Sequence, residues 1–308
     1  MKSLASGRGC IGVALAGLLA ACSTAVKHGT APVAPSDGSS TPVDSATVLV
    51  NGARLFYETT GRGSVVVLIH GGNLDSRMWD DQFIPFAHEH RVIRYDVRGF
   101  GRSGPADTPY EAQADLYALL VALHIPRASL VGLSLGGGIA IDFALTHPEM
   151  VDRLVLASPG LRGWRWAAQD TTWQPQARAI LARGDTVGAA LSWLKSDYMR
   201  PAMEHDSLAP RLLELTAANV PYWKGLLRHG DKERPISPSA ATRVRMIDMP
   251  TLLIVGDRDN IDIQRIVDTL NVQLPHARKV TMHDAGHMVN MEQPERFTEL
   301  VREFLRPQ

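Results

Sequence analysis

The sequence predicts an α/β protein with a mostly parallel, doubly wound sheet of about eight strands and one inserted α-helical segment. Short apolar runs rich in Val, Ile and Leu recur without polar alternation, as is typical of strands buried on both faces of a parallel sheet. Helical patterns separate these runs. Between about 161 and 239 the alternation stops, and only helical patterns remain.

The folded part begins with a hairpin, since Asn51-Gly52 separates two β-rich runs at 47–50 and 54–58. The buried strands that follow are short and non-alternating, and are predicted at 65–69, 91–95, 129–133, 153–157, 251–255 and near 279–282. Helices are predicted between the strands at about 76–89, 109–123 and 137–146, and another begins near Pro294.

The inserted segment 161–239 carries amphipathic helical patterns at 176–181, 186–195 and 208–215. We expect it to cover the C-terminal edge of the sheet. Any one of its Trp residues can simply fill the insertion's own core, but the cluster favours an aromatic surface that faces a pocket. The cluster holds five of the six Trp residues of the chain: Trp164, Trp166, Trp173, Trp193 and Trp223.

The N-terminus is typical of an exported protein. Lys2 and Arg8 precede an apolar run, Ile11–Ala21, that is too short to span a bilayer but suits a signal peptide at 1–21. Residues 22–46 are rich in Ser, Thr, Pro, Ala and Gly, which predicts a flexible tether.

The composition and the absence of certain motifs limit the partners, nucleophiles and cofactors that we expect. Basic and acidic residues number 32 each, so charge gives no reason to expect a nucleic acid partner. The two cysteines are Cys10 and Cys22, which leaves the folded part without a thiol nucleophile or a disulfide. Zinc, phosphate-loop and dinucleotide motifs are absent, so we expect no metal and no cofactor. A small-molecule substrate is expected, and the oligomeric state stays open.

The segment Gly132–Gly137 matches G-x-S-x-G and lies between a predicted strand and a predicted helix, which is the context this motif requires. A sharp turn there would lift the hydroxyl of Ser134 above the sheet, with glycines on either side to avoid neighbouring chain. The following helix would offer free N–H groups at its start. Ser134 is therefore the candidate nucleophile.

A second loop, His70–Asn73, follows the strand at 65–69. An acyl-transfer site needs two backbone donors for the oxyanion, and we predict the N–H groups of Gly72 and Leu135. His70 is expected to brace the turn, and Asn73 to contact substrate.

These motifs resemble the α/β-hydrolase superfamily, in the branch with a helical cap, over about 48–304. The loop 96–103 resembles the family's D-x-R-G-x-G-x-S segment, with an expected architectural role, and 256–259 and 285–287 match its acid and histidine loops. The resemblance implies a core at 47–160 and 240–308 and a cap at 161–239.

The resemblance also implies a triad in the order Ser…Asp…His, met by Ser134, Asp259 and His287. The family's G-x-x-D pattern selects Asp259, with Asp257 as a rival on the same loop. His287 would remove the serine proton, and the acid would hold its ring. Substrate contacts are expected from Asn73 and, beyond the triad, from Trp164, Trp193 and Met288.

The segment Leu19-Ala20-Ala21-Cys22 resembles the lipobox of bacterial lipoproteins, which implies a diacylglycerol-modified Cys22 at the start of the mature chain. Ser23 in the next position favours the outer membrane, with the protein facing the periplasm. A plain secretory signal with an incidental cysteine is the alternative.

The expected activity is hydrolysis of an ester or lactone of a small apolar substrate through an acyl-enzyme. Carbon–carbon bond hydrolysis of ring-cleavage products is an alternative, because Ser158-Pro159-Gly160 loosely resembles that family. Against it, His70–Asn73 lacks the longer H-G-x-G-P-G form, and Met288 stands where that family usually has Trp. A non-catalytic, cap-bearing binding protein is a third interpretation.

Overall fold

The computed structural model describes residues 42–167 and 173–306. The predicted signal peptide 1–21, the lipidation site Cys22 and most of the tether 22–46 lie outside the described residues. Within the two described ranges, no helix is long and apolar enough to cross a membrane.

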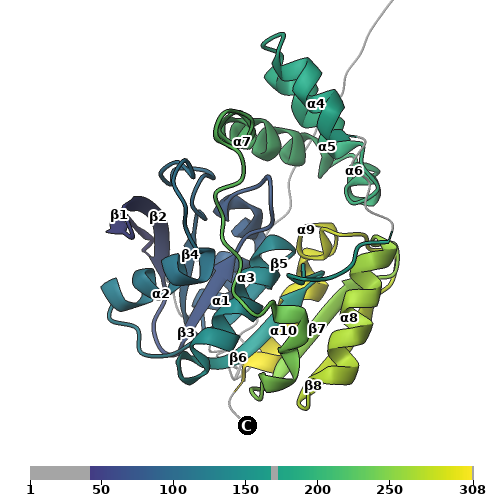
Figure 1. The fold of residues 1–308 in the computed structure, drawn as a ribbon. Coiled ribbons are helices and arrows are strands. Elements are labelled where there is room, and N and C mark those ends of the chain that lie inside the picture. The colour runs from purple at the N-terminus through teal and green to yellow at the C-terminus, as the bar shows by residue number, and fades with distance from the viewer. Residues whose placement is uncertain (1–41, 168–172, 307–308) are drawn as a thin grey trace, which may run out of the picture. The chain divides into compact units, whose positions relative to one another are not determined.

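Within the described residues, eight strands form one sheet in the order β1-β2-β4-β3-β5-β6-β7-β8 (Figure 1). Their bounds are β1 (Asp44–Val50), β2 (Ala53–Thr60), β3 (Val65–Ile69), β4 (Arg91–Tyr95), β5 (Ala128–Leu133), β6 (Val151–Ala157), β7 (Thr251–Gly256) and β8 (Ala277–Met282). The pairs β1–β2 and β2–β4 are antiparallel, and the other neighbouring pairs are parallel. The predicted fold class is confirmed.

The hairpin of β1 and β2 turns at Asn51 and Gly52, whose φ angles are 45° and 79°. Both values are positive, as this tight turn type demands. β1 begins at Asp44, three residues before the predicted start, because its backbone continues to pair with β2 as far as Thr59. The tether, predicted to end at residue 46, therefore overlaps the first residues of β1. An exposed edge strand tolerates polar side chains such as Ser45, so composition alone does not identify these residues as part of a strand.

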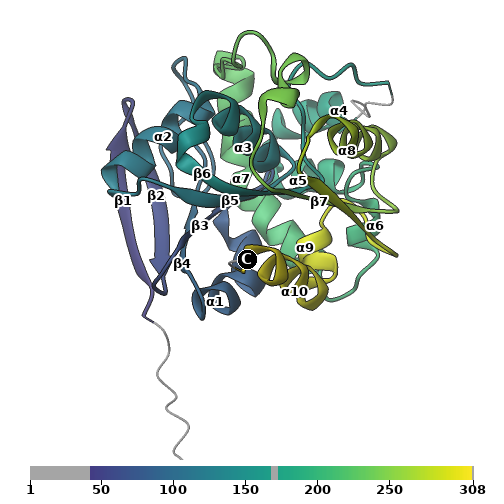
Figure 2. The ribbon, with the colours of Figure 1, turned by 90° about the horizontal axis from the view of Figure 1, so that it is seen from below.

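Helices cover both faces of the sheet (Figure 2). One face carries α2 (Ala112–Ala122), α3 (Leu135–Thr146) and α8 (Ile261–Gln273), and the other carries α1 (Asp80–Ala87) and α10 (Pro294–Leu305). Leu116, Phe143 and Ile266 belong to the apolar core on the first face, while Phe86 and Phe297 belong to the core on the second. α8 was not predicted from the sequence. The sheet is thus packed between two apolar cores, which hold the ends of its strands in place for a functional site.

The cap consists of α4 (Trp173–Leu181), α5 (Thr186–Leu194), α6 (Arg200–Met203) and α7 (Ala209–His229), between β6 and β7. It lies beyond the C-terminal ends of the strands (Figure 1). The last helix was predicted to end at 215 but continues past Pro221 to His229. Proline inside a helix removes one backbone hydrogen bond. Burial of Val220 and Trp223 in the cap's own core keeps the helix continuous.

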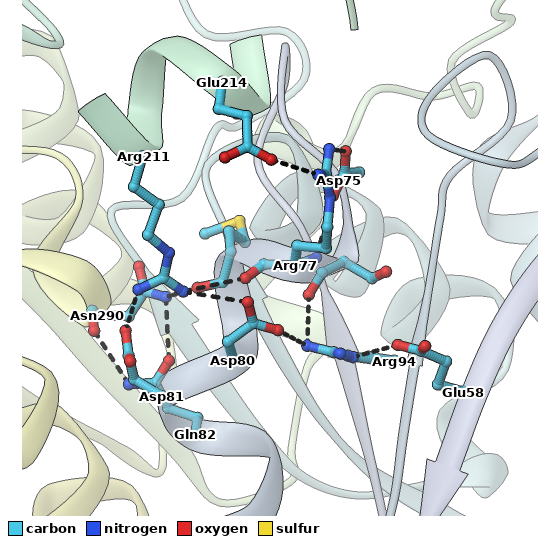
Figure 3. Close-up of polar contacts among 12 residues, drawn as sticks. Glu58, Asp75, Arg77, Asp80, Asp81, Gln82, Arg94, Arg211, Glu214 and Asn290 are labelled. Atoms are coloured by element: carbon cyan, nitrogen blue, oxygen red, sulfur yellow. Dashed lines mark hydrogen bonds and ion pairs between the residues drawn. The ribbon is translucent and has the colours of Figure 1, made fainter. Parts of the chain in front are cut away.

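Ion pairs join the cap to the core at several places, which include an exposed pair of Glu204 with Arg258 and two larger joints. In the first joint, Arg211 of α7 lies 2.6 Å from Asp81 and 3.6 Å from Asp80 at the start of α1, as Figure 3 shows. Nearby, Arg77 in the 3₁₀ turn Ser76–Trp79 lies 3.1 Å from Glu214 of α7. These pairs hold the base of α7 against the core.

The second joint is centred on the buried carboxylate of Asp142. Arg162, where the chain enters the cap, lies 2.6 Å from Asp142 of α3 and also pairs with Glu233, where the chain leaves the cap. One guanidinium therefore ties the entry and the exit of the cap to α3, the helix that directly follows Ser134. Burial raises the pKa of Asp142 to about 6, even though Arg162 opposes that rise.

Candidate active site

Ser134 occupies the turn between β5 and α3 with φ 54° and ψ −112°. This is a strained backbone conformation for a residue other than glycine, and strain of this kind costs roughly 1–3 kcal/mol. A Cβ atom on Gly132 would lie 2.3 Å from the carbonyl oxygen of Gly136, and one on Gly136 would lie 2.1 Å from that of Ile69. The turn is possible because both flanking positions are glycine.

The loop after β3 lies beside this turn. The N–H of Gly71 is engaged with Met78 Sδ at 3.1 Å. In the described part of the chain, no hydrogen bond engages the N–H of Gly72 or of Leu135, the first residue of α3. Both residues line one cavity together with Ser134. The geometry thus suits them to bind an oxyanion.

His70 braces the loop. Its Nε2 accepts the N–H of Val97 at 2.9 Å, which leaves Nδ1 to donate to the carbonyl oxygen of Gly71 at 2.8 Å. Complete burial lowers the pKa of His70, so the ring stays neutral. Asn73, with φ 64°, accepts the indole N–H of Trp223 at 2.6 Å. The loop that carries Gly72 is therefore hydrogen-bonded to the cap.

His287 and Asp259 form a buried pair. Nδ1 of His287 lies 2.9 Å from Oδ1 and 3.2 Å from Oδ2 of Asp259. The rival acid, Asp257, instead lies 3.0 Å from His283 at the surface. The order of the motif and the geometry select the same acid, and His287 lines the same two cavities as Ser134.

Glu292 holds the backbone on both sides of His287, and the sequence analysis missed it. Its two carboxylate oxygens accept the N–H of Gly286 at 2.7 Å and of Met288 at 2.9 Å. Its side chain is fully buried, and burial raises its pKa. The available signal was an acidic residue five positions after His287, at the end of α9 (Val289–Glu292).

Two cavities adjoin Ser134, and Ser134, Leu135, Trp193 and His287 line both of them. The smaller, of about 90 Å³, is completed by Gly71, Gly72, Asn73, Leu74, Leu133, Met199 and Met288. The larger, of about 250 Å³, is completed by Gly160, Trp166, Trp173, Gln174, Tyr198 and Ile263.

The structure thus brings three of the four expected substrate contacts to Ser134, namely Asn73, Trp193 and Met288. Trp164 and Trp166 both pack against the apolar core, but of the two it is Trp166 that lines the larger cavity. The segment has no regular periodicity, so the sequence could not distinguish two Trp residues two positions apart. Tyr198, whose ring lies 5.4 Å from that of His287, gave no signal in the sequence.

The loop 96–103 lies beside the site without lining the two cavities at Ser134. Arg98 and Asp115 form a buried bidentate pair at 2.7 and 2.8 Å. Asp96 accepts the N–H of Ser76 and of Arg102 at 2.9 and 2.8 Å. These bonds fix the loop and agree with an architectural role. Among the described residues, no three His, Cys, Asp or Glu side chains group so that they could hold a metal ion.

A family model described as the alpha/beta hydrolase family matches residues 66–300. 2-Hydroxymuconate semialdehyde hydrolase of Pseudomonas sp. (strain CF600) is 30% identical over 269 residues, which cover 84% of this chain and 92% of that protein. 3-Oxoadipate enol-lactonase 2 of Acinetobacter baylyi is 26% identical, and the match covers 84% of this chain and 96% of that protein. The crystal structure of the enol-lactonase from Burkholderia xenovorans LB400 matches with a TM-score of 0.70 at 25% identity. The match covers 84% of this chain and 99% of that one.

Proposed function

The chain belongs to the alpha/beta hydrolase family, and from this premise we propose that it is a serine hydrolase that cleaves a carboxylic ester or lactone of a small apolar substrate. The observation that carries the proposal is the buried His287–Asp259 pair beside the cavity that Ser134 lines. Relatives whose names include enol-lactonase support it.

In the proposed mechanism, Nε2 of His287 takes the proton of Ser134 as the hydroxyl oxygen attacks the acyl carbon. Asp259 fixes the tautomer of the ring and stabilises the imidazolium. The N–H groups of Gly72 and Leu135 bind the oxyanion. His287 then gives its proton to the leaving alkoxide, and a water activated by the same ring hydrolyses the acyl-enzyme.

The test is covalent labelling by a fluorophosphonate together with turnover of p-nitrophenyl acetate. We expect the protein to be labelled and Ser134→Ala to escape labelling, with kcat lowered about 10³-fold or more. Near-full activity of Ser134→Ala would refute the nucleophile. A wild-type protein that is not labelled would favour a binding role.

A second candidate function is carbon–carbon bond hydrolysis. It is favoured by the relative named 2-hydroxymuconate semialdehyde hydrolase, which is 30% identical. This candidate predicts labelling of Ser134 without measurable turnover of p-nitrophenyl esters or small lactones. Ready ester turnover that depends on Ser134 would exclude it as the main activity.

We also propose that Cys22 is lipidated and that the protein is anchored to the outer membrane, facing the periplasm. The lipobox-like Leu19–Cys22 segment and the following Ser23 support this. Labelled palmitate should enter the wild-type protein but not Cys22→Ser, which should leave the membrane fraction. A wild-type protein that takes up no label and stays soluble would contradict the anchor.

A further inference from the structure

A third cavity lies in the cap, between α4 and α7. It is an open groove of about 120 Å³. Its walls are mostly apolar, and they include Ala177 and Leu181 from α4 and Trp223, Leu226 and Leu227 from α7. Arg178 is the one acidic or basic side chain among the described residues that line it. The groove therefore suits an apolar chain.

The groove adjoins the two cavities at Ser134. It shares Asn73 with the smaller of the two cavities at Ser134. It shares Trp173 and Gln174 with the larger one. An acyl chain that is bound at Ser134 and extends past Asn73 and Trp173 would reach the groove.

The scarcity of charged side chains near Ser134 also favours an uncharged acyl group. Apart from His287, neither cavity at Ser134 has a basic or acidic side chain among its described lining residues. Asp259 and Glu292 lie buried close by. A charged acyl group would therefore find no oppositely charged carboxylate, Lys or Arg side chain among the described residues that line these cavities, and burying its charge there would be costly.

We propose that the groove between α4 and α7 binds a linear, uncharged acyl chain of the ester or lactone cleaved at Ser134. The proposal rests on the function proposed above. The bond from Ser134 Oγ to the acyl carbon forms, the acyl–alkoxy bond breaks, and the alkoxide leaves with the proton carried by His287. Water then releases the chain as a carboxylic acid. The alcohol part occupies the aromatic cavity lined by Trp166 and Tyr198.

The first test is a series of p-nitrophenyl esters from acetate to octanoate with the wild-type protein. Each methylene that the groove buries should raise kcat/KM by up to about fourfold, so that octanoate exceeds acetate by roughly tenfold or more. A flat profile, or one that falls with chain length, would overturn the proposal. This series needs no variant and decides the question even if a substituted protein fails to fold.

A matched pair of cap variants locates the effect. Leu227 lines the groove and is 40% exposed, whereas Val187 on α5 is 50% exposed and does not line it. Leu227→Asp should lower kcat/KM for octanoate about fivefold and leave acetate within about twofold, since only the longer chain reaches this position. Val187→Asp should change neither ester. Equal losses on both esters in Leu227→Asp would overturn the proposal.

The failure of this proposal can be told from that of the proposed function. Labelling of Ser134 and Ser134-dependent turnover of acetate without any chain-length preference would overturn the groove alone. Absence of both labelling and turnover would overturn the two together.

Discussion

The core side and the cap side of the site are fixed by different means. On the core side, Ser134 is held by a strained turn that depends on glycine at 132 and 136, and His287 by a buried carboxylate. On the cap side, Trp193 and Tyr198 are placed by side-chain packing, with ring centroids 5.8 Å apart. The core side is set by the backbone and resists substitution, while the cap side is set by side chains and can change. We infer that chemistry and substrate choice are divided along this line.

The two joints between cap and core differ in the same sense. In the pair of Asp142 and Arg162, the carboxylate belongs to α3 and is buried, and the Arg162 side chain is 21% exposed. The contacts of Arg211 with Asp80 and Asp81 are at least one-third exposed at the carboxylates. Buried charges are costly to ionise but fix geometry, and exposed pairs contribute little.

The largest effect is expected on the core side. Asp259→Asn should lower kcat about 10³- to 10⁴-fold on every substrate, because the amide favours the wrong tautomer of His287. Asp257→Asn is the matched control and should leave kcat within about threefold, since this carboxylate contacts His283 at the surface. Steady-state kinetics on two esters of different length provide the measurement. Equal losses in both variants would remove the distinction between the two acids.

An intermediate effect is expected at the buried joint. Burial raises the pKa of Asp142 to about 6 from 3.8, so the folded state binds this proton more tightly than the unfolded state does. The free energy of unfolding should therefore fall as pH rises from about 4 to about 6 and then level off, by an amount on the order of 3 kcal/mol from this residue.

Urea unfolding at pH 4 and pH 7 measures this effect. In Asp142→Asn the free energy of unfolding should fall less between these pH values, because the contribution of Asp142 is gone. The exposed control Asp107→Asn should show the same fall as the wild type. If the free energy of unfolding of Asp142→Asn depended on pH as that of the wild type does, burial would not raise the pKa of Asp142.

The smallest effect is expected at the exposed joint. Arg211→Ala should lower the free energy of unfolding by about 1 kcal/mol or less, because its ion pairs are solvent-exposed. The loss should shrink further in 1 M NaCl, where such pairs are screened. Arg245→Ala, at another exposed position, controls for the general effect of salt. A loss of several kcal/mol that salt does not change would make the two joints alike.

The core side could be predicted because its signals are local. Gly132 and Gly136 flank Ser134 for steric reasons that the sequence displays directly. His287 follows from its place after the last strand and in the family's triad order, and Asp259 from the family's G-x-x-D pattern in the loop after β7. Glu292 escaped because its role is to accept two backbone N–H groups, and no sequence pattern reports which backbone a carboxylate will contact.

The cap side could be predicted only as a set of helices. Trp164 and Trp166 lie in an irregular segment, where no periodicity tells which ring turns to the cavity. The helical pattern predicted that α7 ends at 215, and burial of Val220 and Trp223 keeps the helix continuous past Pro221. The contact between Asn73 and Trp223 joins residues 150 positions apart, which a single sequence cannot reveal.

Gly136 also sets a limit on how descendants of this chain can diverge. Not even a methyl group fits there, because it would lie 2.1 Å from the oxygen of Ile69. New preferences can therefore arise by substitution in the helices above the strands, while the turn below stays as it is. A directed-evolution library aimed at new specificity should randomise α4 and α7 and leave this turn untouched.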